Sequence, residues 1–197
     1  MHRDGDWHRA FHCWIVSHGP AGAPGIVLQQ RAPGKDTWGS LWDVSVAGHY
    51  ASGEGIDGGI REIQEELGLD VRPEDLLHLG WRREEVFFES GLIEREIQDV
   101  YFLGRDVRLS DLRSDRREVT GVAFVPLPAF RGLTGGERAA VSVQGGRVTE
   151  TGRVVDDRVD LAPEDLVPRA RSYYARVCRT AHRLVAGHLV GQGRRWP

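Results

Sequence analysis

The chain of 197 residues has only two cysteines and a single lysine, and the scarcity of cysteine excludes several classes of site. Cys13 and Cys178 lie far apart and outside any metal-ligand spacing, so a cysteine-based metal site is not expected. Cys13 falls within an apolar strand pattern. This position favours a buried free thiol over a disulfide and fits a cytosolic setting.

Long apolar runs and a strong net charge are also missing. No apolar stretch reaches the roughly 20 residues of a membrane-spanning helix, so we expect no membrane partner. The opening segment, MHRDGDWHRA, lacks the apolar core of a secretory signal, and we expect a cytoplasmic location. A net charge of −3 argues against duplex nucleic acid as the main partner, because affinity for the phosphate backbone needs a basic footprint. A small charged substrate needs only a local basic patch.

Short apolar segments separated by turn residues predict a mixed α/β chain. Turn residues at Glu89-Ser90-Gly91 join two expected strands, and Pro126 with Pro128 favours the start of a small helix. Gly145-Gly146 suits a hairpin turn within residues 133–155. The expected strands are residues 8–17, 25–30, 42–47, 76–88, 96–103 and 122–125.

The C-terminal part of the chain has a helical pattern from Leu166 onward, and Pro168 fits its first turn. The residues that recur at helical intervals are Tyr173, Val177, Ala181, Leu184 and His188. No internal repeat or low-complexity linker interrupts the chain. We therefore expect one domain over residues 1–160, with residues 161–197 forming a C-terminal helix packed on the same domain and ending in a frayed tail.

The most informative segment runs from Gly48 to Leu69, where a glycine-bearing loop precedes a helix with three glutamates. Glu62, Glu65 and Glu66 are spaced i, i+3 and i+4, so they lie on one helix face. Carboxylates crowded in this way repel one another. The cluster becomes favourable when a hard divalent cation such as Mg²⁺ or Mn²⁺ lies among the oxygens.

The same segment carries an apolar stripe that supports the prediction of a helix. We expect this stripe to pack on a sheet, and Gly68 to end the helix in the left-handed conformation. Gly58 and Gly59 weaken the first turn, which should be short or irregular. The stripe consists of Ile56, Ile60, Ile63 and Leu67.

Together these residues resemble the signature box of the Nudix hydrolases. The matching positions are Gly48, Glu54, Arg61, Glu62, Ile63, Glu65, Glu66, Gly68 and Leu69. The spacer between Glu54 and Arg61 is one residue shorter than is usual in the family, which makes the position of Glu54 the least well defined. The resemblance implies a Nudix-type α/β/α sandwich with a mixed sheet and a C-terminal helix.

The resemblance also implies a metal-dependent hydrolase, with water attacking a phosphorus of a nucleoside diphosphate derivative or other organic diphosphate. Glu62, Glu65, Glu66 and the backbone carbonyl of Ala47 would hold Mg²⁺ or Mn²⁺, and Arg61 would hold a ligand carboxylate in place. Metal ions neutralise diphosphate charge and ease the deprotonation of bound water. The sequence leaves the general base open between Glu66 and a residue on a later loop.

Residues 8–66 are also similar to isopentenyl-diphosphate isomerase, which shares the Nudix fold. This similarity implies metal-binding positions at His8 and His49 and a paired acidic site at Glu94 and Glu96. The alternative for the histidines is a hydrogen-bonding role at the edge of the cleft. The alternative for the glutamates is the exposed face of a strand.

The isomerase similarity implies diphosphate contacts for Arg31 and Lys35, which lie in a loop and could otherwise be an exposed solubilising pair. The similarity ends at Ala47, which replaces the isomerase's catalytic cysteine and has no proton to transfer. Hydrolysis is therefore the leading hypothesis. An isomerase-like enzyme and a non-catalytic nucleotide-binding module remain alternatives. Three tryptophans are candidates either for stacking on a base or for the core, namely Trp7, Trp38 and Trp42.

Related hydrolases carry an earlier pair of strands before the segment that resembles HRDGDWHR. We therefore expect an N-terminal element to be missing or supplied by a partner subunit, which leaves a homodimer open.

Overall fold

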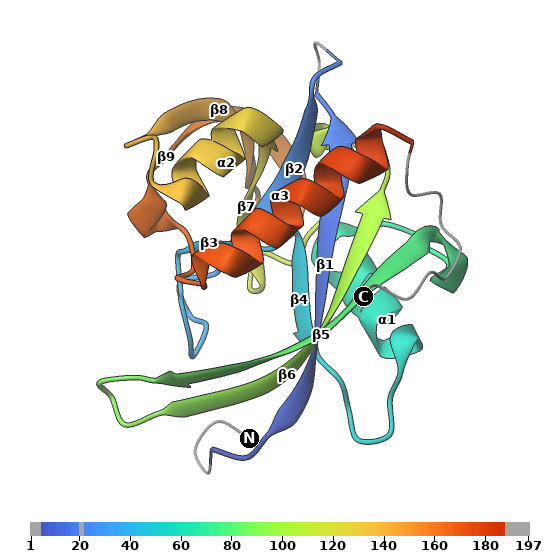
Figure 1. The fold of residues 1–197 in the computed structure, drawn as a ribbon. Coiled ribbons are helices and arrows are strands. Elements are labelled where there is room, and N and C mark those ends of the chain that lie inside the picture. The colour runs from blue at the N-terminus through green and yellow to red at the C-terminus, as the bar shows by residue number, and fades with distance from the viewer. Residues whose placement is uncertain (1–4, 20–21, 188–197) are drawn as a thin grey trace.

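The computed structural model describes residues 5–19 and 22–187, which form a mixed sheet flanked by helices (Figure 1). The strands are β1 (His8–His18), β2 (Pro24–Arg31), β3 (Trp42–Asp43), β4 (Val46–His49), β5 (Leu76–Phe87), β6 (Ile93–Gly104), β7 (Val119–Pro126), β8 (Val141–Val148) and β9 (Val154–Leu161). The α-helices within this part of the chain are α1 (Ile56–Leu67), α2 (Leu127–Gly135) and α3 (Arg171–Val185).

The sheet has the order β5-β6-β1-β2-β7-β8-β9, with β3 paired to β2 and β4 paired to β1. It is mixed because β1 runs parallel to β6 and antiparallel to β2 and β4. Helix α1 covers one face, whereas α2 and α3 cover the other (Figure 1). The predicted α/β/α sandwich is therefore confirmed. None of the helices in the described ranges is long and apolar enough to cross a bilayer.

Strand β1 supplies both cores because its side chains alternate between the two faces. Phe11, Cys13 and Ile15 are fully buried against the α1 side. Trp14 lies in the other core with α2 and α3, and its indole N–H donates to the Tyr173 hydroxyl over 2.9 Å. The C-terminal helix thus packs on the central strand.

Helix α1 follows the predicted pattern. Ile63 and Leu67 are fully buried, and Ile56 and Ile60 pack against the same core. Gly68 ends the helix at φ 69°, in the left-handed region expected of a C-terminal glycine. The helix begins at Ile56 without a side-chain cap, which agrees with the expected irregular first turn.

The glycines that weaken this first turn are explained by close packing. A Cβ on Gly59 would lie 2.3 Å from Cδ2 of Phe11, and one on Gly58 would lie 2.6 Å from a carboxylate oxygen of Glu54. Both distances are shorter than real Cβ contacts. The missing side chains of these glycines allow α1 to approach β1 and the loop before the helix, and the lower helix propensity is the cost of this packing.

Replacing Gly59 with alanine should lower the free energy of unfolding by about 1–3 kcal/mol, because overpacking against Phe11 outweighs the gain in helix propensity. Urea unfolding measures the change. Gly104→Ala is the matched control, since nothing lies within 4 Å of its added Cβ, and it should stay within about 0.5 kcal/mol of the parent. A Gly59→Ala protein as stable as the parent would contradict this packing.

The expected hairpin turn at Gly145-Gly146 is wrong, because both residues lie inside β8 and the turn falls at residues 149–153. A Cβ on Gly145 would lie 2.3 Å from Val159, and one on Gly146 equally close to Val154. The glycines make room for valines of the neighbouring strand. By contrast, the turn at Glu89-Ser90-Gly91 and the helix after Pro126 are confirmed.

The single strand expected at residues 42–47 is also wrong, since the chain crosses there from β2 to β1. Strand β3 pairs with β2, and β4 pairs with β1. Ser45, at the crossing, accepts a hydrogen bond from the Ile15 N–H over 2.8 Å and donates to the Val27 carbonyl. This crossover places Asp43 on β3 and Ala47 on β4.

Helix α3 starts at Arg171 and not after Leu166. Leu166 instead bridges to Trp42, and the Val167 N–H donates to the Trp42 carbonyl over 2.8 Å. Pro168 also disfavours helical geometry in the residue before it. His188 and the tail after it lie outside the described residues.

Candidate active site

A cavity of about 430 Å³ opens between α1, the loop at residues 32–41 and strands β5 and β6. Nine of its lining residues are predicted site residues. The predicted residues that line it are Arg31, Lys35, Ala47, His49, Arg61, Glu62, Glu66, Glu94 and Glu96. Glu65 is absent from this lining. The cavity therefore gathers these nine residues from four separate stretches of chain, within residues 31–35, 47–49, 61–66 and 94–96.

Glu66 is the most deeply buried carboxylate of the box. One of its oxygens accepts hydrogen bonds from the Gln29 side chain and from the Ala47 N–H, each over 3.0 Å. Burial nevertheless raises the pKa of Glu66 to about 8. Burial also raises the pKa of Glu62, against the effect of Arg61. Both carboxylates thus carry a cost of burial that a bound cation would offset.

The first box glycine is required by Glu62. A Cβ on Gly48 would lie 2.4 Å from the Glu62 carboxyl group, so any larger residue would displace that carboxylate. The short strand β4 and the helix α1 therefore meet through a glycine and a glutamate at the cavity wall. This contact explains the place of Gly48 in the box without invoking its backbone conformation.

Arg61 connects the box glutamates to one another. Its guanidinium lies 3.1 Å from Glu62, 3.4 Å from Glu65 and 3.3 Å from Glu54. The Glu65 side chain is 57% exposed and does not line the cavity. Glu54 also accepts the Ala51 N–H over 2.7 Å, which places it in the loop before α1.

Arg31 and Lys35 form the cationic wall of the cavity. The Arg31 Nε donates to the Thr37 carbonyl over 3.1 Å, and its Nη1 lies 3.6 Å from Asp43. Lys35 pairs with Glu118. Both cations therefore lie at the cavity with a carboxylate beside them, and they are not merely a solubilising surface pair.

The three tryptophans considered for stacking occupy different environments. Trp42 belongs to the core, and Trp7 is exposed. Trp38 lines the cavity with φ at 53° and contacts the Phe88 ring at a centroid distance of 4.9 Å. A tryptophan in the left-handed region is uncommon and costs roughly 1–3 kcal/mol. The loop that carries Lys35 is therefore held in a strained conformation.

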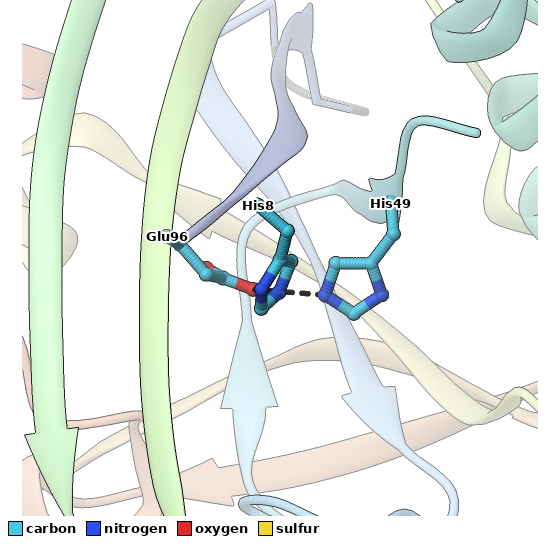
Figure 2. Close-up of side chains that lie close together, drawn as sticks. All are labelled: His8, His49 and Glu96. Carbon is cyan, nitrogen blue, oxygen red and sulfur yellow. Dashed lines mark hydrogen bonds and ion pairs between the residues drawn. The ribbon is translucent and has the colours of Figure 1, made fainter. Parts of the chain in front are cut away.

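His8, His49 and Glu96 form a cluster, shown in Figure 2, in which His49 and Glu96 line the cavity and His8 does not. His49 Nε2 lies 2.9 Å and His8 Nε2 3.7 Å from the same Glu96 oxygen. One ligand atom from each residue lies within 4.8 Å of the others, a spacing compatible with a shared metal ion. Burial opposes ionisation of Glu96, but hydrogen bonds from His49 and His8 outweigh it and hold the Glu96 pKa well below its usual range.

Glu94 lies next to this cluster and has a different environment. It is buried and accepts a hydrogen bond from the Thr37 hydroxyl over 3.1 Å. Burial and the neighbouring Glu96 charge raise its pKa. The structure therefore places both predicted glutamates at the cavity and not on the exposed face of the strand.

Sequence reasoning missed five histidine, acidic or arginine residues that line the same cavity. Glu84 lies on a strand whose alternation could have indicated an inward position. Arg169 gave no such signal, because its segment resembles the first turn of a helix. The missed residues are His12, Asp43, Glu84, Glu118 and Arg169.

The comparison with protein families places this site in a known context. The family model described as NUDIX domain matches residues 6–143, which include the box and both cavity walls. The chain belongs to the Nudix hydrolase family. As a Nudix enzyme it is a pyrophosphohydrolase, so the predicted family and enzyme class are confirmed.

Relatives of this Nudix enzyme include hydrolases and isomerases. It is 34% identical over 179 residues to an uncharacterised Nudix hydrolase of Clostridium acetobutylicum, covering 91% of this chain and 86% of that protein. It is 33% identical over 130 residues to an isopentenyl-diphosphate Delta-isomerase of Saccharopolyspora erythraea, covering 66% and 63%. The solved MutT protein from Methanosarcina mazei Go1 shares the fold, with a TM-score of 0.58, 19% identity and coverage of 90% and 96%.

Proposed function

We propose that this Nudix enzyme hydrolyses a nucleoside diphosphate derivative or another organic diphosphate, with water attacking phosphorus and Mg²⁺ or Mn²⁺ as cofactor. The observation that carries the proposal is the pairing of two walls in one cavity. Glu62 and Glu66 lie on the box side, and the cavity is also lined by Arg31, the last residue of β2, and by Lys35 on the loop that follows it. Carboxylates that attract a metal and cations that attract phosphate suit a metal–diphosphate complex.

The residues present fit a divalent ion. Glu62 is partly buried and Glu66 is buried, and burial raises the pKa of both carboxylates, a cost that a bound cation would offset. In our proposal Glu62, Glu65, Glu66 and the carbonyl of Ala47 hold it. When bound, Mg²⁺ or Mn²⁺ neutralises phosphate charge and lowers the pKa of water.

The other residues bind and orient the substrate. Arg31 offers a planar pair of donors to a phosphate, whereas Lys35 offers a point charge. His49 is held by the ionised Glu96 and, with Glu94, forms the far wall on which the rest of the substrate rests. Arg61 keeps the box carboxylates oriented through its ion pairs.

A panel of nucleoside and prenyl diphosphates, incubated with and without Mg²⁺, tests this function directly. We expect metal-dependent release of phosphate or a monophosphate from at least one compound. No product from any compound would show that the proposed reaction is wrong. Tight nucleotide binding by calorimetry without turnover would support a non-catalytic binding module in its place.

A second candidate, isomerisation of an allylic diphosphate, is favoured by two observations. His8, His49 and Glu96 converge as the isomerase similarity implies, and the chain is 33% identical to an isopentenyl-diphosphate isomerase. However, Ala47 offers no proton at the position of the isomerase's cysteine. Deuterium uptake into isopentenyl diphosphate from deuterated water would support isomerisation, and we expect none.

Arg31→Gln should lower kcat/KM by roughly 10- to 100-fold, because hydrogen bonds between charged groups contribute about 1.5–3 kcal/mol. The loss should appear mainly in KM, since Arg31 holds the phosphate in both the ground and transition states. Steady-state kinetics measure it. Arg147→Gln, at an exposed position on β8, is the matched control and should leave both constants unchanged. Equal kinetic constants for the two variants would show that Arg31 does not bind the phosphate.

We also propose a cytoplasmic location, since both cysteines are buried free thiols. Residues 1–160 would form the hydrolase domain, with residues 161–197 packed on it through α3.

A homodimer is proposed through the free edge of β5. This edge exposes Trp81 (62%) and Phe87 (65%), with Arg83 and Glu85 between them. Two antiparallel copies would set Arg83 opposite Glu85 of the partner chain. Sedimentation velocity should show a dimer that Trp81→Arg dissociates, whereas a monomer at all concentrations would contradict this assembly.

A further inference from the structure

Arg169 lies in the segment before α3 and is almost completely enclosed. Its side chain is 4% exposed, yet it lines the cavity beside two carboxylates. Its Nη2 donates to Asp43 over 2.8 Å, and its Nη1 donates to Glu84 over 2.5 Å. One guanidinium therefore bridges β3 and β5, which are not paired with each other in the sheet.

Asp43 shares its two oxygens between two arginines. One oxygen bonds to Arg169, and the other lies 3.6 Å from Arg31. The Asp43 side chain is 2% exposed, so no bulk water can replace either partner. The Arg169-bonded oxygen of Asp43 also accepts the Val44 N–H over 2.8 Å, and Arg31 also donates to the Thr37 carbonyl. Arg169 is thus the buried cation that, with these backbone contacts, fixes Asp43 beside the Arg31 guanidinium.

Glu84 extends the network to the opposite wall. The oxygen that bonds to Arg169 also accepts the Gln98 side-chain amide over 2.7 Å. The same amide donates to Glu96 over 2.6 Å, and Glu96 holds His49. A continuous chain of polar contacts thus runs from Arg31 through Arg169 to His49.

The charges of this network depend on Arg169. Burial opposes ionisation of Asp43, but Arg169 and Arg31 outweigh it and lower the Asp43 pKa. The pKa of Glu84 is lowered against burial by Arg169 and Arg82. A buried ion pair adds little net stability compared with apolar packing, whereas removal of one partner leaves an uncompensated charge. Its value lies in fixing the geometry of what it touches.

We infer that Arg169 is a positioning residue that holds the phosphate-binding Arg31 in place through Asp43. The inference rests on the proposed function, because it gives Arg31 the role of binding phosphate. It also concerns a residue outside the stretch matched by the family model. The contact is made by the C-terminal segment, so the proposed phosphate clamp depends on how that segment docks onto β3.

Binding of methylenediphosphonate with Mg²⁺, measured by calorimetry, tests this in a double-mutant cycle of Arg169→Met and Arg31→Gln. We expect each single variant to weaken binding roughly 10- to 100-fold and the double variant to be no weaker than the weaker single one, since both remove the same interaction. Arg179→Met, on the exposed face of α3, is the control and should bind like the parent.

If Arg169→Met does not fold, as shown by the absence of a cooperative unfolding transition, Arg169→Lys takes its place in the experiment. Lysine retains the charge but lacks the two-armed geometry, so it should fold and still lose affinity. Parent-like binding by a folded Arg169 variant, or losses that multiply in the double variant, would overturn the inference alone. Failure of the parent protein to bind the diphosphonate would overturn the proposed diphosphate site, and the inference with it.

Discussion

Glu66→Gln is expected to lower kcat for diphosphate hydrolysis by about 100- to 1,000-fold, the range found when one strong electrostatic contact to a reacting centre is lost. Glutamine keeps the shape of the side chain and can still accept the bonds from Gln29 and Ala47. It removes the negative charge that the proposed metal would need. The fold should therefore persist while activity and Mg²⁺ affinity fall together.

Kinetics and metal titration of Glu66→Gln give the measurement, with thermal unfolding as the check on folding. Glu164→Gln, an exposed carboxylate far along the chain from the box, is the matched control and should behave like the parent. Glu65→Gln tests the remaining member of the proposed metal set. Retention of full activity by both Glu65→Gln and Glu66→Gln would refute the assignment.

His12→Gln should make the protein less sensitive to acid. Burial, assisted by Arg169, lowers the pKa of His12 to about 4 from its ordinary value of 6.5. The unfolded chain binds this proton near pH 6.5 and the folded protein does not, so the contribution is fully present above pH 6.5 and is lost as pH falls. Between pH 6.5 and 5 the expected loss is about 1.5 kcal/mol.

The comparison must be made between the variant and the parent, because Glu66 contributes a slope of the opposite sign. Its raised pKa means that stability is present below about pH 4.5 and is lost as pH rises towards about 8. Urea unfolding at several pH values gives both slopes. His182→Gln, exposed on α3, should keep the parent slope. An unchanged slope in His12→Gln would show that His12 takes up its proton without cost.

The parts of the fold predicted from sequence are those set by local pattern. Helix α1 was predicted from its apolar stripe and from Gly68, because both depend on residues within one turn of each other. The box glutamates and Arg61 were found in the same way. The cavity also gathers His49, Glu94 and Glu96, which were selected through resemblance. Arg31 and Lys35 were selected as a nearby arginine and lysine that could clamp a phosphate, and the resemblance favoured them further.

The errors arose where distant strands decide local structure. Gly145 and Gly146 suit a turn, but they lie in a strand, where valines of β9 occupy the space that side chains at these positions would fill. Leu166 fits a helical interval, but its backbone bridges to Trp42. The position of Arg169 follows from this second contact, since pairing of Leu166 with Trp42 places the Arg169 guanidinium beside Asp43. No property of the surrounding sequence encodes that partner.

Hydrolysis in water enriched in ¹⁸O, followed by mass spectrometry of the products, tests the central claim most directly. Attack by water on phosphorus places the heavy oxygen in a phosphate-containing product, only when Mg²⁺ is present and Glu66 is intact. Phosphate product without the label in enriched water, or labelled product formed equally by Glu66→Gln, would contradict the account.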